Sequence, residues 1–190
     1  MVGAVTVSRF EIPQGQEREY EQMLLSFGDE VSNDRGFIAT SVWQEVDNPN
    51  RFLRLTAFKD FESLFKSYDE MVQSGFLETA VEKWGIAPDV KRIVPIEKKG
   101  AGVEHMRENP FVSVSIRAME PGQGDPWVQK MKYNFAEIES LPGMQGWFIG
   151  RCDELDDEIV GIVGWASEEA CRRTIPPHMH YPVTVYRRYR

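Results

Sequence analysis

The sequence predicts an α+β fold in which one β-α-β-β-α-β unit occurs twice in 190 residues. Two stretches carry the repeat: GAVTVSRFEIPQGQ at 3–16 and NPFVSVSIRAMEPGQ at 109–123. Gly122 matches Gly15, a displacement of 122 − 15 = 107. The same ungapped displacement aligns Val5 with Val112, Tyr20 with Trp127, Gly36 with Gly143 and Phe58 with Trp165. Because an internal repeat fixes architecture more firmly than local propensity does, we expect two similar halves.

In the first half, the predicted strands alternate apolar and polar residues, and the predicted helices have apolar residues every three or four positions. Asp60 is a good N-cap for the second helix. Polar residues 47–50 make a tight hairpin turn between two strands. In chain order we expect a strand at 4–12, a helix at 16–31, strands at 37–46 and 51–58, a helix at 61–72, a helical piece at 76–84 and a strand at 90–96.

The second half repeats this order up to its last helix. Asp125 and Pro126 are typical of a helix start, and Pro176 and Pro177 stop a short helix. Nothing there corresponds to the helical piece at 76–84. We expect strands at 111–119, 144–152, 158–165 and 183–189, and helices at 125–138 and 167–175. Residues 97–108 are expected to form a linker, so the predicted domains are 1–96 and 109–190.

The β-α-β-β-α-β order is the ferredoxin-like arrangement, in which two helices cover one face of an antiparallel sheet. The other face must also be covered, and a second copy of the same unit is an economical cover. The fold class predicted is therefore an internal pseudo-dimer in which two ferredoxin-like halves form an α+β barrel. A further homodimer is compatible with this prediction.

Composition argues against several classes of protein. The net charge of −8 disfavours binding to nucleic acid, which needs clustered Lys and Arg. No apolar run approaches the ~20 residues that cross a bilayer, and the N-terminus lacks a signal-peptide pattern, so we expect no membrane partner and a cytoplasmic protein. Cys152 and Cys171 have no paired spacing, which indicates neither a disulfide nor a zinc site.

Local motifs in both halves point to one family. The first half has P-x-G-Q at 13–16, G-F at 36–37 and F-x-D-x-E at 58–62, and the second has P-G-Q at 121–123, G-M at 143–144 and W-x-S-x-E at 165–169. This order resembles the dimeric α+β barrel superfamily, and within it a tandem duplication of the antibiotic biosynthesis monooxygenase domain.

The resemblance implies a pocket between the sheet and its helices. In that family the pocket serves cofactor-free oxygenation of polyphenols, haem degradation or no known chemistry. The haem-degrading branch has an Asn on the first strand and a Trp and a His on the second helix, and this sequence lacks that Asn and that His. The resemblance therefore implies no cofactor, with haem as the less favoured reading.

We place the functional pocket in the second half, because Pro176 and Pro177 shorten its last helix whereas residues 76–84 are suited to plug the same space in the first half. Strand arginines are costly when they point inward without an anion. We expect catalysis to involve His178 as the titrating group and Arg117 as the positive charge that stabilises an anionic intermediate. The ligand-binding residues expected beside them are Trp147, Trp165 and His180. The arginines on predicted strands, any of which could bind an anion, are Arg9, Arg54 and Arg117.

An interpretation without a functional role stays open for each of these residues. Trp147 and Trp165 are equally typical of a core, and His178 and His180 of an exposed segment. No third ligand accompanies the two histidines, so no metal site is predicted.

Two functions of different classes follow from these observations. The first is a cofactor-independent monooxygenase that acts on an aromatic or polycyclic small molecule. The second is a non-catalytic ligand-binding or assembly protein on the same barrel, with haem binding as a third reading. Sequence motifs of serine hydrolases, P-loop proteins, dinucleotide-binding proteins and zinc proteases are absent.

Overall fold

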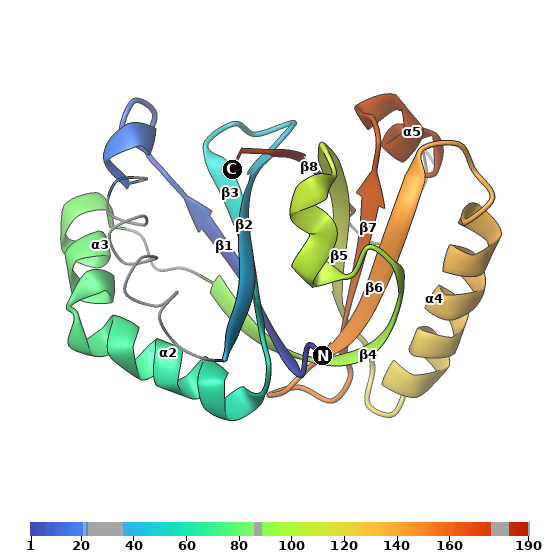
Figure 1. Cartoon of the computed structure of the whole chain (residues 1–190), viewed down its shortest axis with the longest axis horizontal. Coiled ribbons are helices and arrows are strands. Elements are labelled where there is room, and N and C mark those ends of the chain that lie inside the picture. Colours follow the sequence, from blue (N-terminus) through green and yellow to red (C-terminus); the bar gives the residue numbers. More distant parts are fainter. Residues whose placement is uncertain (21, 23–35, 86–88, 176–182, 190) are drawn as a thin grey trace.

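A computed structural model describes residues 1–20, 22, 36–85, 89–175 and 183–189 of the chain (Figure 1). Most boundaries of the elements below agree with the sequence-based predictions within two residues, whereas most of the helix predicted at 16–31 lies outside the described residues. The elements are β1 (Ala4–Glu11), β2 (Phe37–Glu45), β3 (Arg51–Phe58), α2 (Phe61–Gln73), α3 (Phe76–Trp84), β4 (Asp89–Gly100), the 3-10 helix η1 (Val103–Glu108), β5 (Phe111–Ala118), α4 (Gly124–Ile138), β6 (Met144–Cys152), β7 (Glu158–Trp165), α5 (Glu168–Arg173) and β8 (Thr184–Arg188).

The strands form one closed antiparallel barrel in the order β1-β3-β2-β8-β5-β7-β6-β4. Each half contributes four adjacent strands, and the halves join at the pairs β2–β8 and β4–β6. Figure 1 shows α2 and α3 outside one side of the barrel and α4 outside the other. The predicted pseudo-dimer of two ferredoxin-like halves is confirmed, and the two sheets are also continuous through hydrogen bonds.

The two glycines that define the repeat have the same backbone conformation. Gly15 has a φ of 87° and Gly122 a φ of 79°, a region that only glycine enters without strain. Each lies in the turn between the first strand and the first helix of its half. The G-Q pair that both motifs share therefore marks a similar turn in each half.

Side chains alternate between the two faces of the barrel wall, as the period of a strand requires. On β1, Val5 and Val7 belong to the core inside the barrel, whereas Ser8 faces outward beneath the helices. On β3, Leu53 and Leu55 point inward in the same way, and Arg54 between them points outward. The outward face of the first half is thus where polar strand residues meet the helices.

Residues 97–108, expected to be a linker, also take part in the barrel. Strand β4 continues to Gly100 because its end pairs with β6, with Lys98 opposite Phe148. The turn η1 then packs against β2 and β3, and Val103 and Met106 are buried in the barrel core. Figure 1 shows η1 between the two sheets. The connection between the halves therefore fills the space that they enclose.

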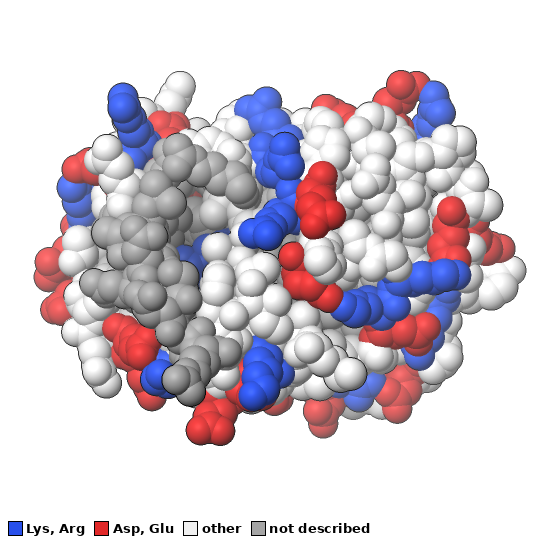
Figure 2. Space-filling model, in the orientation of Figure 1, with Lys and Arg blue, Asp and Glu red and all other residues white. Residues whose placement is uncertain are grey.

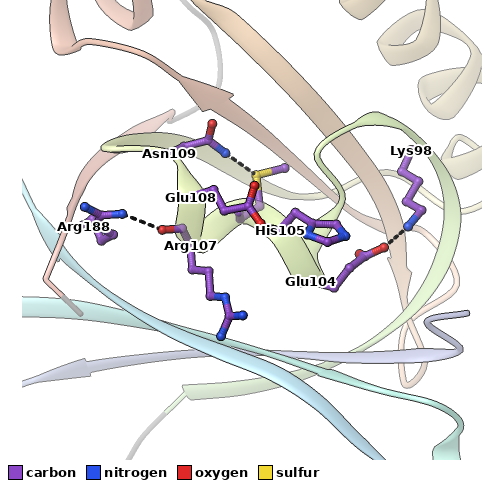
Figure 3. Close-up of polar contacts among 8 residues, drawn as sticks. Lys98, Glu104, His105, Arg107, Glu108, Asn109 and Arg188 are labelled. Atoms are coloured by element: carbon purple, nitrogen blue, oxygen red, sulfur yellow. Dashed lines mark hydrogen bonds and ion pairs between the residues drawn. The ribbon is translucent and has the colours of Figure 1, made fainter.

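Polar contacts at both ends hold η1 in this position (Figure 3). Lys98 pairs with Glu104, and Arg188 Nη1 donates to the carbonyl oxygen of Arg107 at 2.8 Å. His105 Nδ1 lies 3.0 Å from Glu108 Oε1, and both side chains are exposed. These contacts connect η1 to both halves, since Lys98 lies on β4 and Arg188 on β8.

Asp60 and Asp157 stabilise the helix starts around the barrel. Asp60 Oδ1 accepts a hydrogen bond from Ser63 N at 2.8 Å, which confirms the predicted N-cap of α2. Asp157 accepts from Gly122 N at 2.8 Å and from Gly124 N at 2.7 Å, and these bonds lower the pKa of its carboxyl group. Asp157, in the turn between β6 and β7, thus fixes the start of α4.

The surface carries charges of both signs. On the face drawn in Figure 2, acidic and basic side chains are interspersed among uncharged ones, as on an ordinary solvated surface. Within the described ranges, no helix has the length and apolar character required to cross a bilayer.

Candidate functional site

A cavity of about 170 Å³ lies between the outward face of the first-half sheet and the helices that cover it. Strands β1, β3 and β4 form its floor, and α2 and α3 form much of its wall. Its lining combines aromatic rings, aliphatic side chains and a few polar groups, the usual make-up of a small-molecule site. The lining residues are Thr6, Ser8, Phe10, Tyr20, Arg54, Phe58, Leu64, Phe65, Ser67, Tyr68, Met71, Phe76, Leu77, Val90, Arg92 and Glu154.

Arg54 is the central charged group of this cavity. Its side chain is half-buried on β3, and its Nε is buried without a hydrogen-bond partner among the described residues. No ion pair joins Arg54 to a carboxylate in the part of the chain that the structure describes. Burial lowers the pKa of the guanidinium, although an arginine stays charged at neutral pH. A cation held in this way is suited to bind an anion inside the cavity.

Aromatic rings surround this charge. The ring of Phe10 lies 5.1 Å from that of Tyr20, and Tyr20 meets Trp84 edge-on at 5.4 Å between centroids. Burial raises the pKa of Tyr20 to about 12, partly offset by the positive charge of Arg54. Tyr20 therefore remains protonated at neutral pH, and its hydroxyl group can donate a hydrogen bond to an anionic ligand. The wall is suited to a flat aromatic molecule with an acidic oxygen.

Arg92 and Glu154 lie together in the cavity lining. Arg92 Nη2 is 2.7 Å from Glu154 Oε1, and Arg92 Nε is 3.5 Å from Asp153 Oδ2. The Arg92 guanidinium also lies over the ring of Phe65 on α2, 5.2 Å from its centroid. Both acidic residues come from the β6–β7 turn, so the second half contributes to the cavity of the first.

Among the described residues of the second half, an apolar side chain occupies the position equivalent to Arg54. The displacement of 107 puts Gly161 where the first half has Arg54, and Trp127 where it has Tyr20. A side chain at Gly161 would collide with the methyl group of Met131, which occupies the vacated place. Arg117, the counterpart of Phe10, lies over the ring of Trp127 at 4.4 Å. Because residue 161 is a glycine and not an arginine, Met131 can pack directly against this sheet.

This cavity lies in the first half, whereas we expected the functional pocket in the second; residues 176–182, on which that expectation depends, lie outside the described residues, and a second-half pocket stays a prediction. The helical piece at 76–84 was expected to plug the first half. Instead, Phe76 and Leu77 form part of the cavity wall, whereas Ala80 and Trp84 pack to one side with Phe10, Tyr20 and Phe52. Bulk in a helix closes a pocket only when the side chains point into it.

The described candidates of the second half are packed side chains with partners. Trp147 is buried and its Nε1 donates to Glu139 Oε1 at 2.8 Å. Trp165 is 1% exposed and its Nε1 donates to Ser113 Oγ at 3.0 Å. Neither belongs to the lining of the first-half cavity, and a ligand contact for them stays a prediction.

His178 and His180 lie outside the described residues, and their roles also stay predictions. Of the three strand arginines, Arg9 pairs with Asp89 and Arg117 lies over Trp127, which leaves Arg54 facing the cavity. The alternation around Leu53 and Leu55 could have indicated that Arg54 points outward. No sequence signal shows that Glu154 reaches the same cavity.

Known structures share this fold. Two proteins named "putative monooxygenase" align over nearly the whole chain. The one from Fusobacterium nucleatum has 9% sequence identity and a TM-score of 0.75, and the alignment covers 100% of this chain and 93% of that chain. The one from Lactobacillus acidophilus has 15% sequence identity and a TM-score of 0.69, and the alignment covers 99% of this chain and 94% of that chain. An anthrone oxidase-like protein aligns at 13% identity and a TM-score of 0.71, covering 99% of this chain and 92% of its own. A search of curated proteins found no match.

The family comparison points to the half with the cavity. Residues 4–70 match the model of the antibiotic biosynthesis monooxygenase family, a range that contains β1, β2, β3 and most of α2. Arg54 and Tyr20 lie within this range. Residues 4–70 thus match the model of the antibiotic biosynthesis monooxygenase family, and the whole chain shares its fold with solved structures of monooxygenase-type proteins.

Proposed function

We propose that this protein is a cofactor-independent monooxygenase that oxidises an aromatic or polycyclic small molecule in the first-half cavity. The observation that carries the proposal is Arg54, a guanidinium in an aromatic cavity that has no carboxylate partner among the described residues. The family match over 4–70 supports the reaction class.

Arg54 favours the ionised form of a phenolic or enolic substrate. Its positive charge stabilises the negative oxygen that forms when the substrate loses a proton. The resulting carbanion is electron-rich enough to reduce molecular oxygen directly, so the substrate supplies the electrons. For an anthrone, the methylene carbon becomes a carbonyl: one O₂ is consumed, one oxygen atom enters the product and the other leaves as water.

The aromatic wall positions the substrate, and a bound substrate displaces water from the cavity. Phe10, Phe58 and Phe65 offer ring faces and edges to a flat substrate, and Tyr20 can donate a hydrogen bond to its oxygen. A bound substrate displaces water from around Arg54, and this strengthens the attraction between Arg54 and the substrate anion.

Oxygen consumption with anthrone and with a panel of hydroquinones tests the proposal. Anthrone is chosen because one structural relative is an anthrone oxidase-like protein. We expect one O₂ consumed per anthraquinone formed, and a loss of ~100-fold or more in kcat/KM for Arg54→Met, in the range seen when a charge-stabilising group is removed. Arg9→Met is the matched control, because Arg9 is also a strand arginine but pairs with Asp89.

Two outcomes would count against the proposal. Unchanged turnover in Arg54→Met would remove Arg54 from the mechanism. Binding of the aromatic ligands without oxygen consumption would favour the non-catalytic ligand-binding protein, and a haem absorbance band after addition of haemin would favour the haem-binding reading.

A further inference from the structure

A carboxylate from the second half reaches the cavity of the first half. Glu154 lies in the turn between β6 and β7, yet it lines the cavity whose other walls come from residues of the first half. The β4–β6 pairing brings it there, because Ile93 lies opposite Cys152 and Asp153 N donates to the carbonyl oxygen of Arg92 at 2.8 Å. An isolated first half would lack this carboxylate.

Arg92 stays paired with a carboxylate whether or not Glu154 is charged. Arg92 Nη2 contacts Glu154 Oε1 at 2.7 Å, while Arg92 Nε faces Asp153 Oδ2 at 3.5 Å. If Glu154 takes up a proton, Asp153 still balances the guanidinium. Glu154 can therefore gain and lose a proton without leaving an uncompensated charge beside it.

The remaining ionisable groups of the cavity are poor proton acceptors. Among the described lining residues, Arg54 and Arg92 are cations and Tyr20 and Tyr68 are phenols, and burial raises the pKa of Tyr20 to about 12. Among the lining residues that the structure describes, Glu154 is the single carboxylate. About half of its side chain is exposed, which gives a proton a route to solvent.

We infer that Glu154 is the catalytic base that removes the substrate proton, an inference that rests on the proposed function. A substrate C–H bond breaks, the proton moves to a carboxylate oxygen of Glu154, and the electron pair stays on the substrate, delocalised onto the oxygen beside Arg54. After O₂ has added to the carbon, Glu154 returns the proton to the peroxide. Loss of the second C–H proton and of hydroxide then yields the carbonyl and one water.

Proton removal can be tested without oxygen. Under anaerobic conditions in D₂O, exchange of the anthrone methylene hydrogens for deuterium is followed by NMR with native protein, Glu154→Gln and Asp156→Asn. We expect the native protein to accelerate exchange and Glu154→Gln to lose ~100-fold or more of that acceleration, as is typical of a lost general base. Asp156→Asn removes an exposed charge from the same turn and should keep the native rate.

Binding and folding controls separate a base from a structural role. Glu154→Gln should keep the native thermal midpoint and the native affinity for 1,8-dihydroxyanthraquinone, which has no proton to lose at the reacting carbon. Loss of that affinity would assign Glu154 to shaping the site and overturn the inference. Native-rate exchange in Glu154→Gln, or no acceleration by the native protein, would also overturn it. Exchange that depends on Glu154 without oxygen consumption would instead refute the proposed oxygenation and leave the base in place.

Discussion

Arg54→Met should make the protein more stable while it removes the anion site. In the native cavity, the Arg54 Nε is buried without a hydrogen-bond partner among the described residues, and burial lowers the pKa of the guanidinium. A buried polar group without a partner costs about 1–3 kcal/mol in mutational data. Methionine keeps most of the side-chain length and can adapt to the aromatic walls.

We therefore expect Arg54→Met to raise the free energy of unfolding by ~1–2 kcal/mol, from the lower part of that range. In a chain of this size this corresponds to a rise in Tm of roughly 2–8 °C. Urea denaturation followed by tryptophan fluorescence measures the change, provided that the m-value stays the same. The control Arg9→Met removes an exposed ion pair with Asp89 and should lose at most ~1 kcal/mol.

The opposite result would refute the reasoning. If Arg54→Met lowers the free energy of unfolding by about 1 kcal/mol or more, Arg54 has a partner in the folded protein and is not free to bind a ligand. A stability gain together with lost ligand binding is the trade-off expected of a functional residue.

Three further changes test the fold around the site. Met106→Ala should cost ~2–5 kcal/mol in urea denaturation, because Met106 is fully buried between the sheets, and a smaller loss would mean that η1 is peripheral. Gly161→Ala should cost ~1–3 kcal/mol through the collision with Met131, whereas a neutral result would mean that the second-half space is open. Asp157→Asn should lower Tm at pH 7, because the folded-state pKa of Asp157 is depressed and its stabilisation is present above its unfolded pKa of about 3.9. The difference from the native protein should vanish as the pH falls through the folded pKa, and a difference that persists in acid would contradict the assignment.

Local signals in the sequence predicted most of the fold. The repeat of Gly15 at Gly122 reflects two identical turns, and Asp60 caps the helix that was expected after it. These features depend on neighbouring residues, so they can be recognised from the chain alone. The length of β4 could not be predicted, because residues 97–100 are held by β6, a strand distant in the sequence.

The site was harder to predict, because it depends on which of two similar halves stays open. Arg54 was among the strand arginines singled out, but its role depends on the lack of a carboxylate partner, a property of three-dimensional packing. The second half closes because Met131 enters the space beside Gly161. Glu154 reaches the cavity only through the pairing of β4 with β6, which no local pattern reveals.

A crystal structure with 1,8-dihydroxyanthraquinone tests the location of the site most directly. We expect one ligand per chain in the first-half cavity. An oxygen of the ligand should lie at hydrogen-bond distance from the Arg54 guanidinium, and the ring system should lie against Phe10 and Phe58. A ligand bound in the second half beside Trp165, or between the two sheets in place of η1, would contradict it.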